Sequence, residues 1–275
     1  MSNKLVEIPI NKWPTLRDLY TKRKDRASCY NFLQTLINWK NKEPELQLSI
    51  YSLNGDWETD GTFVAKFLYQ VFFNTCGDNQ ERLLKALNCL DSAKSYTLAG
   101  YQDFVVPTVE QHFIDSGLDK EVCKPTCTVW YHITKEQAKQ FTVDAPSNVQ
   151  FKPLEECHAE HINSVWPHRG PGSIDFVKLL IRQNDSVGLF DNNNLVAWCL
   201  ILPLGALGLL QVMDTHKRKG FGNLAVRYMS KLLAEKEIEV TAPVVIDNVA
   251  SRAMFEKLGF KVIDKVYWAD KPANK

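Results

Sequence analysis

The 275-residue chain is predicted to be an α/β protein of the α+β kind, in which helices flank a mixed, largely antiparallel sheet. Short segments rich in β-branched and aromatic residues alternate with segments whose apolar residues recur every three or four positions. Hydrophobic residues make up 45% of the chain and charged residues 24%, as in ordinary globular proteins. A polar stretch with a proline at residues 142–148 separates two strand-like segments, which predicts two domains, 1–145 and 146–275.

The elements of the first domain are predicted from apolar patterns alone. Residues 46–51 are expected to form a strand that ends in the Asn54-Gly55 turn. Residues 62–74 are very apolar and fit a strand followed by a buried helix, although periodicity does not decide between the two. Helices are expected at residues 81–93 and 107–116. This half has no chemistry-bearing motif, so its aromatic residues are interpreted as core.

The second domain has a more regular pattern. Helices are expected at residues 154–166, 173–182, 221–237 and 250–258, and strands at residues 149–153, 186–190, 195–202, 209–213, 240–246, 260–263 and 266–268. Residues 191–194, Asp-Asn-Asn-Asn, are a hairpin-type loop between two of these strands. The alternation of helices with antiparallel strand pairs indicates helices packed on a mixed sheet.

The informative segment is Met213-Asp-Thr-His-Lys-Arg-Lys-Gly-Phe-Gly-Asn223, which joins a strand to a long helix. Such a junction exposes unpaired amides and the positive end of the helix dipole, which favour a pyrophosphate. Gly220 and Gly222 remove side chains where backbone would approach phosphate closely, and three consecutive cations precede them. A solvated basic loop is the plain alternative. A Rossmann dinucleotide site is disfavoured because the chain lacks G-x-G-x-x-G.

Two motifs resemble those of the GNAT acyltransferase superfamily. Lys217-x-x-Gly220-x-Gly222 is similar to its (Gln/Arg)-x-x-Gly-x-(Gly/Ala) pyrophosphate loop. The segment from Asn248 to Phe260, Asn-Val-Ala-Ser-Arg-Ala-Met-Phe-Glu-Lys-Leu-Gly-Phe, resembles its second motif at a separation that leaves room for one helix and one strand. The resemblance covers roughly residues 149–268. It implies a GNAT-type sheet, preceded by a divergent N-terminal half that is itself a candidate copy of the same fold.

Within that superfamily the chain looks most like the glycine N-acyltransferase-like proteins, whose Trp-His-containing stretch is similar to Trp166-Pro-His168-Arg169-Gly170. The resemblance implies transfer of an acyl group from acyl-CoA or acetyl-CoA to an amine, with a small molecule such as an amino acid as the expected acceptor. A protein or peptide N-acetyltransferase and a catalytically inactive CoA-binding scaffold are the alternatives. Motif matching implies that these residues contact the cofactor: Met213, Lys217, Arg218, Lys219, Gly220, Phe221, Gly222, Asn223, Asn248 and Phe255.

The general base is left open because Thr215 stands where glycine acyltransferases have a glutamate. An amino acid's ammonium must lose a proton before its nitrogen attacks. His216 is a candidate base, Asp214 is a second that would act through a water, and His168 is a third whose loop would face the acceptor. Structural loop roles are the alternative for each. Phe255 replaces the superfamily's frequent tyrosine and cannot donate a proton, so CoA is expected to leave as the thiolate or to use another donor.

Composition argues against several other classes. A net charge of +1 gives no support for nucleic-acid or anionic-membrane binding. No apolar run approaches the roughly 18 residues of a membrane span, and no targeting signal is recognised, so a cytoplasmic protein with reduced thiols is expected. The spacing of Cys123, Cys127, Cys157 and His158 matches no compact zinc pattern, so no metal is assigned. Cys199, on a core strand, is interpreted as a buried thiol and not as an acyl-enzyme nucleophile.

Overall fold

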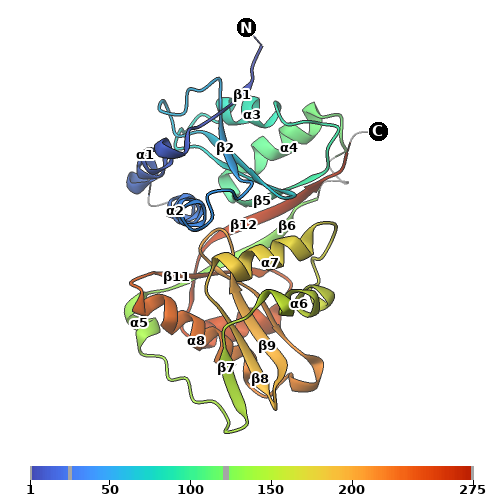
Figure 1. The fold of residues 1–275 in the computed structure, drawn as a ribbon. Helices are drawn as coiled ribbons and strands as arrows, with labels where there is room; N and C mark the ends of the chain where they lie inside the picture. The colour runs from blue at the N-terminus through green and yellow to red at the C-terminus, as the bar shows by residue number, and fades with distance from the viewer. Residues whose placement is uncertain (1, 24–26, 120–123, 274–275) are drawn as a thin grey trace. The chain divides into compact units, whose positions relative to one another are not determined.

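The chain forms two compact units. The computed structural model (Figure 1) describes residues 2–23, 27–119 and 124–273. Unit 1 consists of residues 1–128 with 264–275, and unit 2 consists of residues 129–263. These limits differ from the expected domains, 1–145 and 146–275. The difference arises because a strand belongs to the sheet that satisfies its backbone hydrogen bonds, whatever its place in the sequence.

Unit 1 contains a sheet in the order β1-β2-β3-β4-β5-β12. Its strands are β1 (Leu5–Glu7), β2 (Ser49–Leu53), β3 (Phe63–Phe67), β4 (Gln70–Asn74), β5 (Tyr96–Gln102) and the part of β12 (Lys261–Lys271) that follows residue 263. Its helices are α1 (Trp13–Leu19), α2 (Ala27–Lys42), α3 (Glu81–Leu87) and α4 (Val106–Asp115). Neighbouring strands are antiparallel except β4 and β5, which run parallel. Phe32, Phe67 and Phe72 are buried and stack on one another, which confirms that aromatic residues of this half form core.

Unit 2 contains an antiparallel sheet in the order β10-β9-β8-β7, and β11 lies beside β6. Its strands are β6 (Thr126–Ile133), which begins in unit 1, β7 (Val149–Lys152), β8 (Ser186–Asp191), β9 (Asn194–Ile201), β10 (Leu207–Val212) and β11 (Val240–Val245). Its helices are α5 (Lys135–Lys139), α6 (Ala159–Val165), α7 (Ser173–Gln183), α8 (Phe221–Glu235) and α9 (Val249–Lys257). The expected α+β fold of helices on a mixed, mostly antiparallel sheet is confirmed.

The two units are built from the same series of elements. In chain order each has a strand, two helices, three strands, a helix, a strand and a helix, from β1 to α4 and again from β7 to α9. One more strand follows each series, β6 after α4 and β12 after α9. However, β6 lies beside β11 of the second series, and β12 pairs with β5 of the first. Each unit therefore takes its last strand from the end of the other series.

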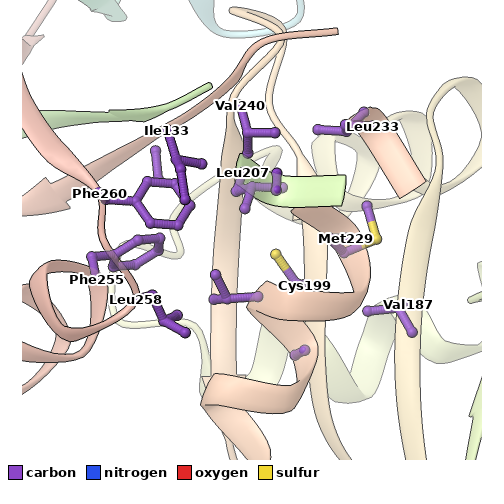
Figure 2. Close-up of a cluster of buried hydrophobic side chains, with 14 of the residues drawn as sticks. Ile133, Val187, Cys199, Leu207, Met229, Leu233, Val240, Phe255, Leu258 and Phe260 are labelled. Atoms are coloured by element: carbon purple, nitrogen blue, oxygen red, sulfur yellow. The ribbon is translucent and has the colours of Figure 1, made fainter. Parts of the chain in front are cut away.

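Helix α8 is fixed on the sheet of unit 2 by an apolar face. Its buried residues include Phe221, Ala225, Met229 and Leu233, which recur every four positions. Figure 2 shows Met229 beside Cys199 of β9 and Leu233 near Val240 of β11. Burying side chains as large as those of Phe221, Met229 and Leu233 contributes about 1.5–3 kcal/mol each. This packing places the start of α8 close to the end of β10.

Two predictions of secondary structure are wrong in detail. Residues 62–74 contain two strands, β3 and β4, where a strand followed by a buried helix was expected. All five residues of β4 are buried, so the strand has no exposed face whose polar residues would reveal a period of two. Residues 261–271 form the single strand β12 where two strands were expected. The polar pair Asp264-Lys265 that suggests a turn lies on this continuous strand.

Candidate functional site

One edge of β10 is free of strand partners in the described part of the chain. β10 ends its sheet and pairs only with β9, while β11 is close to it but belongs to the other sheet. The Met213 amide donates to the Val196 carbonyl at 2.8 Å. Alternate residues of an antiparallel strand turn their peptide groups to opposite edges, so Val212 directs its N–H and C=O away from β9. The amide of Met213, an expected cofactor contact, is therefore used within the sheet.

A bulge interrupts β10 a few residues before Val212. The register with β9 shifts between Gly208 and Gln211, and Leu209 has a positive φ of 47°. A bulge breaks the alternation of a strand and leaves a residue unpaired in the ladder. Leu210 and Val212 are only partly buried and pack against the core of unit 2. Together these features give β10 an apolar, half-open surface beside its unpaired edge.

The loop from β10 to α8 ends in an uncapped helix start. After the short 3-10 helix η6 (Asp214–His216), Arg218 and Gly220 adopt positive φ values of 62° and 86°. Gly220 occupies the N-cap position, where no side chain caps the described helix. The first backbone bond of α8 runs from the Leu224 amide to the Gly220 carbonyl. The amides of residues 221–223 precede that bond, so they are first-turn donors available to an anion.

Gly222 lies where the start of α8, the end of β10 and α9 come together. A Cβ at this position would lie 3.4 Å from Val212 Cγ2 and 3.5 Å from Met254 Sδ. Those are ordinary contact distances, so the fold tolerates a methyl group there. Gly222 is itself in the first turn of α8, so a longer side chain there would start beside the free amides. The position therefore connects the amide-rich loop with the strand edge.

The three cations of the loop are accessible. Lys217 pairs with Asp214, Nζ to Oδ1 at 2.6 Å, and both side chains are exposed. Arg218 and Lys219 are also exposed, and the charge of Lys219 contributes to lowering the pKa of Asp191. Because the loop lies next to the positive end of α8, its cations and the helix dipole act on the same region.

Phe221 and Phe255, two expected cofactor contacts, are largely buried. Phe221 is 5% exposed and its ring lies 5.4 Å from the His216 ring. Phe255 is 3% exposed; its ring stacks on Tyr131 at 5.8 Å and meets Phe260 edge-on at 5.0 Å. Asn223 is half-buried in the first turn of α8. Both phenylalanines therefore contribute to the core beneath the loop and α9.

Asn248 caps α9. Its side chain accepts a hydrogen bond from the Ser251 amide at 3.1 Å. Asn248→Ala is expected to lower the free energy of unfolding by about 1 kcal/mol, because alanine leaves that amide without its acceptor. Urea denaturation measures the change, with Asn248→Asp as a control that keeps an acceptor. Equal stability of the alanine variant and the wild type would show that the cap contributes nothing.

The three candidate bases have different surroundings. Asp214 is exposed and ion-paired with Lys217. Both ring nitrogens of His216 are engaged, Nε2 with Asp191 Oδ2 at 3.1 Å and Nδ1 with Thr215 Oγ1 at 2.8 Å. His168 is exposed between α6 and α7, touches Trp166 edge-on at a centroid distance of 6.3 Å, and has no hydrogen bond to any described residue. Of the two imidazoles, that of His168 is the one without a hydrogen-bond partner among the described residues.

Asp191 is a site residue that the sequence pattern did not reveal. It ends β8 and precedes Asn192 and Asn193, whose positive φ values make the expected hairpin turn. Its carboxylate accepts from His216 and from Asn148 Nδ2, and these bonds hold the pKa of Asp191 below its ordinary value. In the sequence Asp191 has the signature of a turn residue, and nothing there links it to a histidine 25 positions later.

The interpretation of Cys199 as a buried thiol is confirmed. Cys199 is fully buried, and burial raises the pKa of its thiol to about 12, so it is no nucleophile at neutral pH. Across residues 2–23, 27–119 and 124–273 no three His, Cys, Asp or Glu side chains are grouped to hold a metal ion. Cys123 lies outside the described residues.

Across residues 2–23, 27–119 and 124–273 no helix has the length and apolar character that a membrane span requires.

Comparisons with known proteins agree with this architecture. The family model described as FR47-like protein matches residues 186–269. The X-ray structure of a Drosophila protein, 23% identical, has a TM-score of 0.89 over 99% of this chain and 100% of its own. A tandem GNAT protein from the clavulanic acid biosynthesis pathway, 13% identical, has a TM-score of 0.60 over 99% of each chain. A GCN5-related N-acetyltransferase from Sphaerobacter thermophilus, 11% identical, has a TM-score of 0.56 over 100% of this chain and 96% of its own. No curated protein matches the sequence.

The chain has the fold of the GNAT superfamily, and its likeness to a tandem GNAT protein extends through both units. The expected GNAT-like character of the N-terminal half is thereby confirmed. At identities of 11–23% the likeness concerns the fold, and function has to be argued from the site.

Proposed function

We propose that this chain is an acyl-CoA-dependent N-acyltransferase whose donor site lies in unit 2, between the loop of residues 217–220 and the outer edge of β10. We call these four residues the CoA loop. The observation that carries the proposal is that an uncapped helix start, three cations and an unpaired strand edge occur together. Each alone is common in proteins. Their combination matches the two chemically distinct parts of CoA, an anionic diphosphate and an amide-bearing arm.

Unit 1 supplies an internal comparison for this site. At the equivalent place, β4 is followed by Thr-Cys-Gly-Asp-Asn-Gln at residues 75–80, a loop without a cation. There β4 pairs directly with β5, Gln70 with Thr97 and Val71 with Leu98, so the strand edge is occupied. In unit 2 the equivalent strands, β10 and β11, belong to different sheets. We therefore assign one donor site to the chain, and we assign it to unit 2.

The residues of unit 2 fit the diphosphate and the pantetheine arm. The first-turn amides of residues 221–223 donate to the diphosphate, and Lys217, Arg218 and Lys219 add charge to it and to a 3′-phosphate. The pantetheine amides pair with the Val212 peptide group, which takes the role first expected for Met213. The bulge at Leu209 lies further along β10, where an outward amide would polarise the thioester carbonyl.

The transfer itself needs a neutral amine. Its nitrogen attacks the thioester carbonyl carbon, the C–S bond breaks, and CoA leaves as the thiolate because Phe255 has no proton to give. The amine's proton passes to a base. We rank His168 first among His168, His216 and Asp214, since its imidazole has no other hydrogen bond within the described residues.

We propose a small-molecule amine, such as an amino acid, as the acceptor. The support is the resemblance of the Trp166-Pro-His168-Arg169-Gly170 stretch to that of glycine N-acyltransferase-like proteins. A protein or peptide acceptor and a CoA-binding protein without turnover remain the competing outcomes of the experiments below.

A thermal-shift titration with CoA, acetyl-CoA and a longer or aromatic acyl-CoA tests the donor site. Each ligand at a hundred times its Kd is expected to stabilise the protein by about 2.7 kcal/mol. The best donor then enters an acceptor screen that measures release of the CoA thiol with single amino acids and with peptides. CoA binding without release of the thiol would favour the inactive scaffold. Release of the thiol with peptides alone would favour the protein acetyltransferase. No shift at millimolar CoA would overturn the proposed function.

A further inference from the structure

We propose that Asp191 and His216 form a latch that holds the CoA loop in its binding shape, so that both are positioning residues for the donor. This inference rests on the proposed function. The latch joins the hairpin between β8 and β9 to the segment between β10 and α8, two parts of unit 2 that are 25 residues apart in the sequence.

The hydrogen bond of the latch is shielded and well supported. His216 Nε2 lies 3.1 Å from Asp191 Oδ2, and the two side chains are 16% and 21% exposed. The other oxygen, Asp191 Oδ1, accepts from Asn148 Nδ2 at 2.7 Å and from Asn192 Nδ2 at 3.0 Å. Three donors therefore hold the carboxylate in one orientation. By contrast, the Lys217–Asp214 pair on the same segment is exposed to solvent, and such pairs contribute little order.

His216 also holds the far end of the CoA loop. His216 precedes the loop and Phe221 follows it, and their rings lie 5.4 Å apart. Phe221 is buried as the first residue of α8. The contact closes the four-residue loop at its base, and the bond to Asp191 ties that base to the hairpin. Lys217, Arg218 and Lys219 are thus presented from a fixed platform.

The hydrogen bonds of His216 favour positioning over proton removal. A carboxylate only accepts hydrogen bonds, so Nε2 carries the proton that Asp191 accepts. In the neutral ring Nδ1 then accepts from the Thr215 hydroxyl, 2.8 Å away. Neither nitrogen is open to an acceptor amine unless one of these bonds breaks. An imidazole whose two nitrogens are both hydrogen-bonded is well suited to orient a neighbouring segment.

Charge alone predicts the opposite effect from the latch, which makes the proposal testable. Asp191 is a negative group close to Lys219, and removing it would strengthen the attraction between the loop and an anionic ligand. If the group acts as a latch, removing it loosens the loop and weakens binding. Asp214 is the matched control, because it is also an acidic residue beside the loop but bonds only to an exposed lysine.

The experiment measures the Kd for CoA by titration calorimetry in the full chain. If loss of the latch leaves the loop correctly shaped about one tenth of the time, Asp191→Ala weakens CoA binding about tenfold. His216→Phe, which keeps a ring beside Phe221, is expected to weaken binding similarly, and the double variant no further. Asp191→Asn keeps an acceptor for His216 and is expected to restore most of the affinity. Asp214→Ala is expected to bind as well as wild type or more tightly.

Limited trypsin digestion without CoA gives a second, independent measurement, since residues 217–219 are three successive tryptic sites. Asp191→Ala is expected to be cut in the loop several-fold faster than wild type, because cleavage follows local opening, and Asp214→Ala is not. Unchanged or tighter CoA binding by Asp191→Ala, with unchanged cleavage, would overturn the latch while leaving the donor site intact. Failure of the wild type to bind CoA would overturn the proposed function, and the cleavage rates would still decide the latch.

Discussion

Gly222→Glu is expected to abolish CoA binding while the protein stays folded. The new Cβ meets Val212 and Met254 at ordinary contact distances, so the backbone has no reason to shift. The carboxylate then extends toward the first turn of α8, where the free amides and the CoA loop would otherwise meet the diphosphate. Juxtaposed like charges cost several kcal/mol, which corresponds to at least a 100-fold loss of affinity. Titration calorimetry with CoA measures it.

Gly222→Gln separates charge from bulk. It adds a side chain of the same length without the negative charge, so it is expected to bind CoA more weakly than wild type but more tightly than the glutamate variant. The urea denaturation midpoints of both variants check that the fold is kept. Wild-type affinity in Gly222→Glu would contradict the assignment of the donor site to this loop, whatever the fate of the latch.

Local sequence was sufficient to predict the helix and loop of this site. The apolar stripe of α8 begins at Phe221 as expected, because a helix packed on a sheet needs one apolar position every three or four residues. Gly220 was singled out in the sequence as a position where backbone could approach phosphate closely, and its positive φ of 86° is a second reason for glycine there. Such features depend on near neighbours in the chain, and so they are visible in the sequence.

Features that depend on distant pairing were not predictable in the same way. The exchange of β6 and β12 between the two series follows from which sheet edge each strand meets, and a strand carries no local mark of its partner. The bond between Asp191 and His216 is of the same kind. Similarly, motif matching implied that Met213 contacts the cofactor, whereas its amide donates to the Val196 carbonyl within the sheet. Which edge of the sheet each peptide group of a strand faces becomes known only when the register of the strand is known.

The two units show why the fold alone does not define the function. Both have the same series of elements, yet the loop after β4 has no cation and that strand is paired with β5, whereas β10 keeps a free edge and is followed by three cations. The proposed chemistry therefore depends on the sequence of one loop and on the pairing of one strand. We expect that closing the edge of β10 would leave the fold intact and remove the proposed donor site.

A fall in pH is expected to destabilise unit 1 through His112. This histidine of α4 is 1% exposed; its Nε2 lies 3.0 Å from Tyr96 Oη and its Nδ1 2.7 Å from Asn88 Oδ1. Burial, together with the charge of buried Lys271, lowers the pKa of His112 from 6.5 to about 4, while the charge of Asp115 opposes both. His112 is therefore neutral in the native protein at pH values where the unfolded chain is protonated.

The sign of the effect follows from this difference in proton binding. Between pH 6.5 and about 4 the unfolded chain binds a proton at residue 112 and the native protein does not. The contribution of His112 to the free energy of unfolding is therefore fully present above pH 6.5 and is lost as the pH falls toward 4. The full difference in pKa corresponds to roughly 3 kcal/mol. Urea denaturation at a series of pH values measures it, comparing wild type with His112→Gln and with His168→Gln, the same substitution at an exposed histidine. His112→Gln is expected to lose most of the pH dependence and His168→Gln to keep it. Equal dependence of unfolding free energy on pH in the two variants would contradict the prediction. His112 would then have to be protonated in the native state, with its Nε2 donating a hydrogen bond to Tyr96 Oη instead of accepting one.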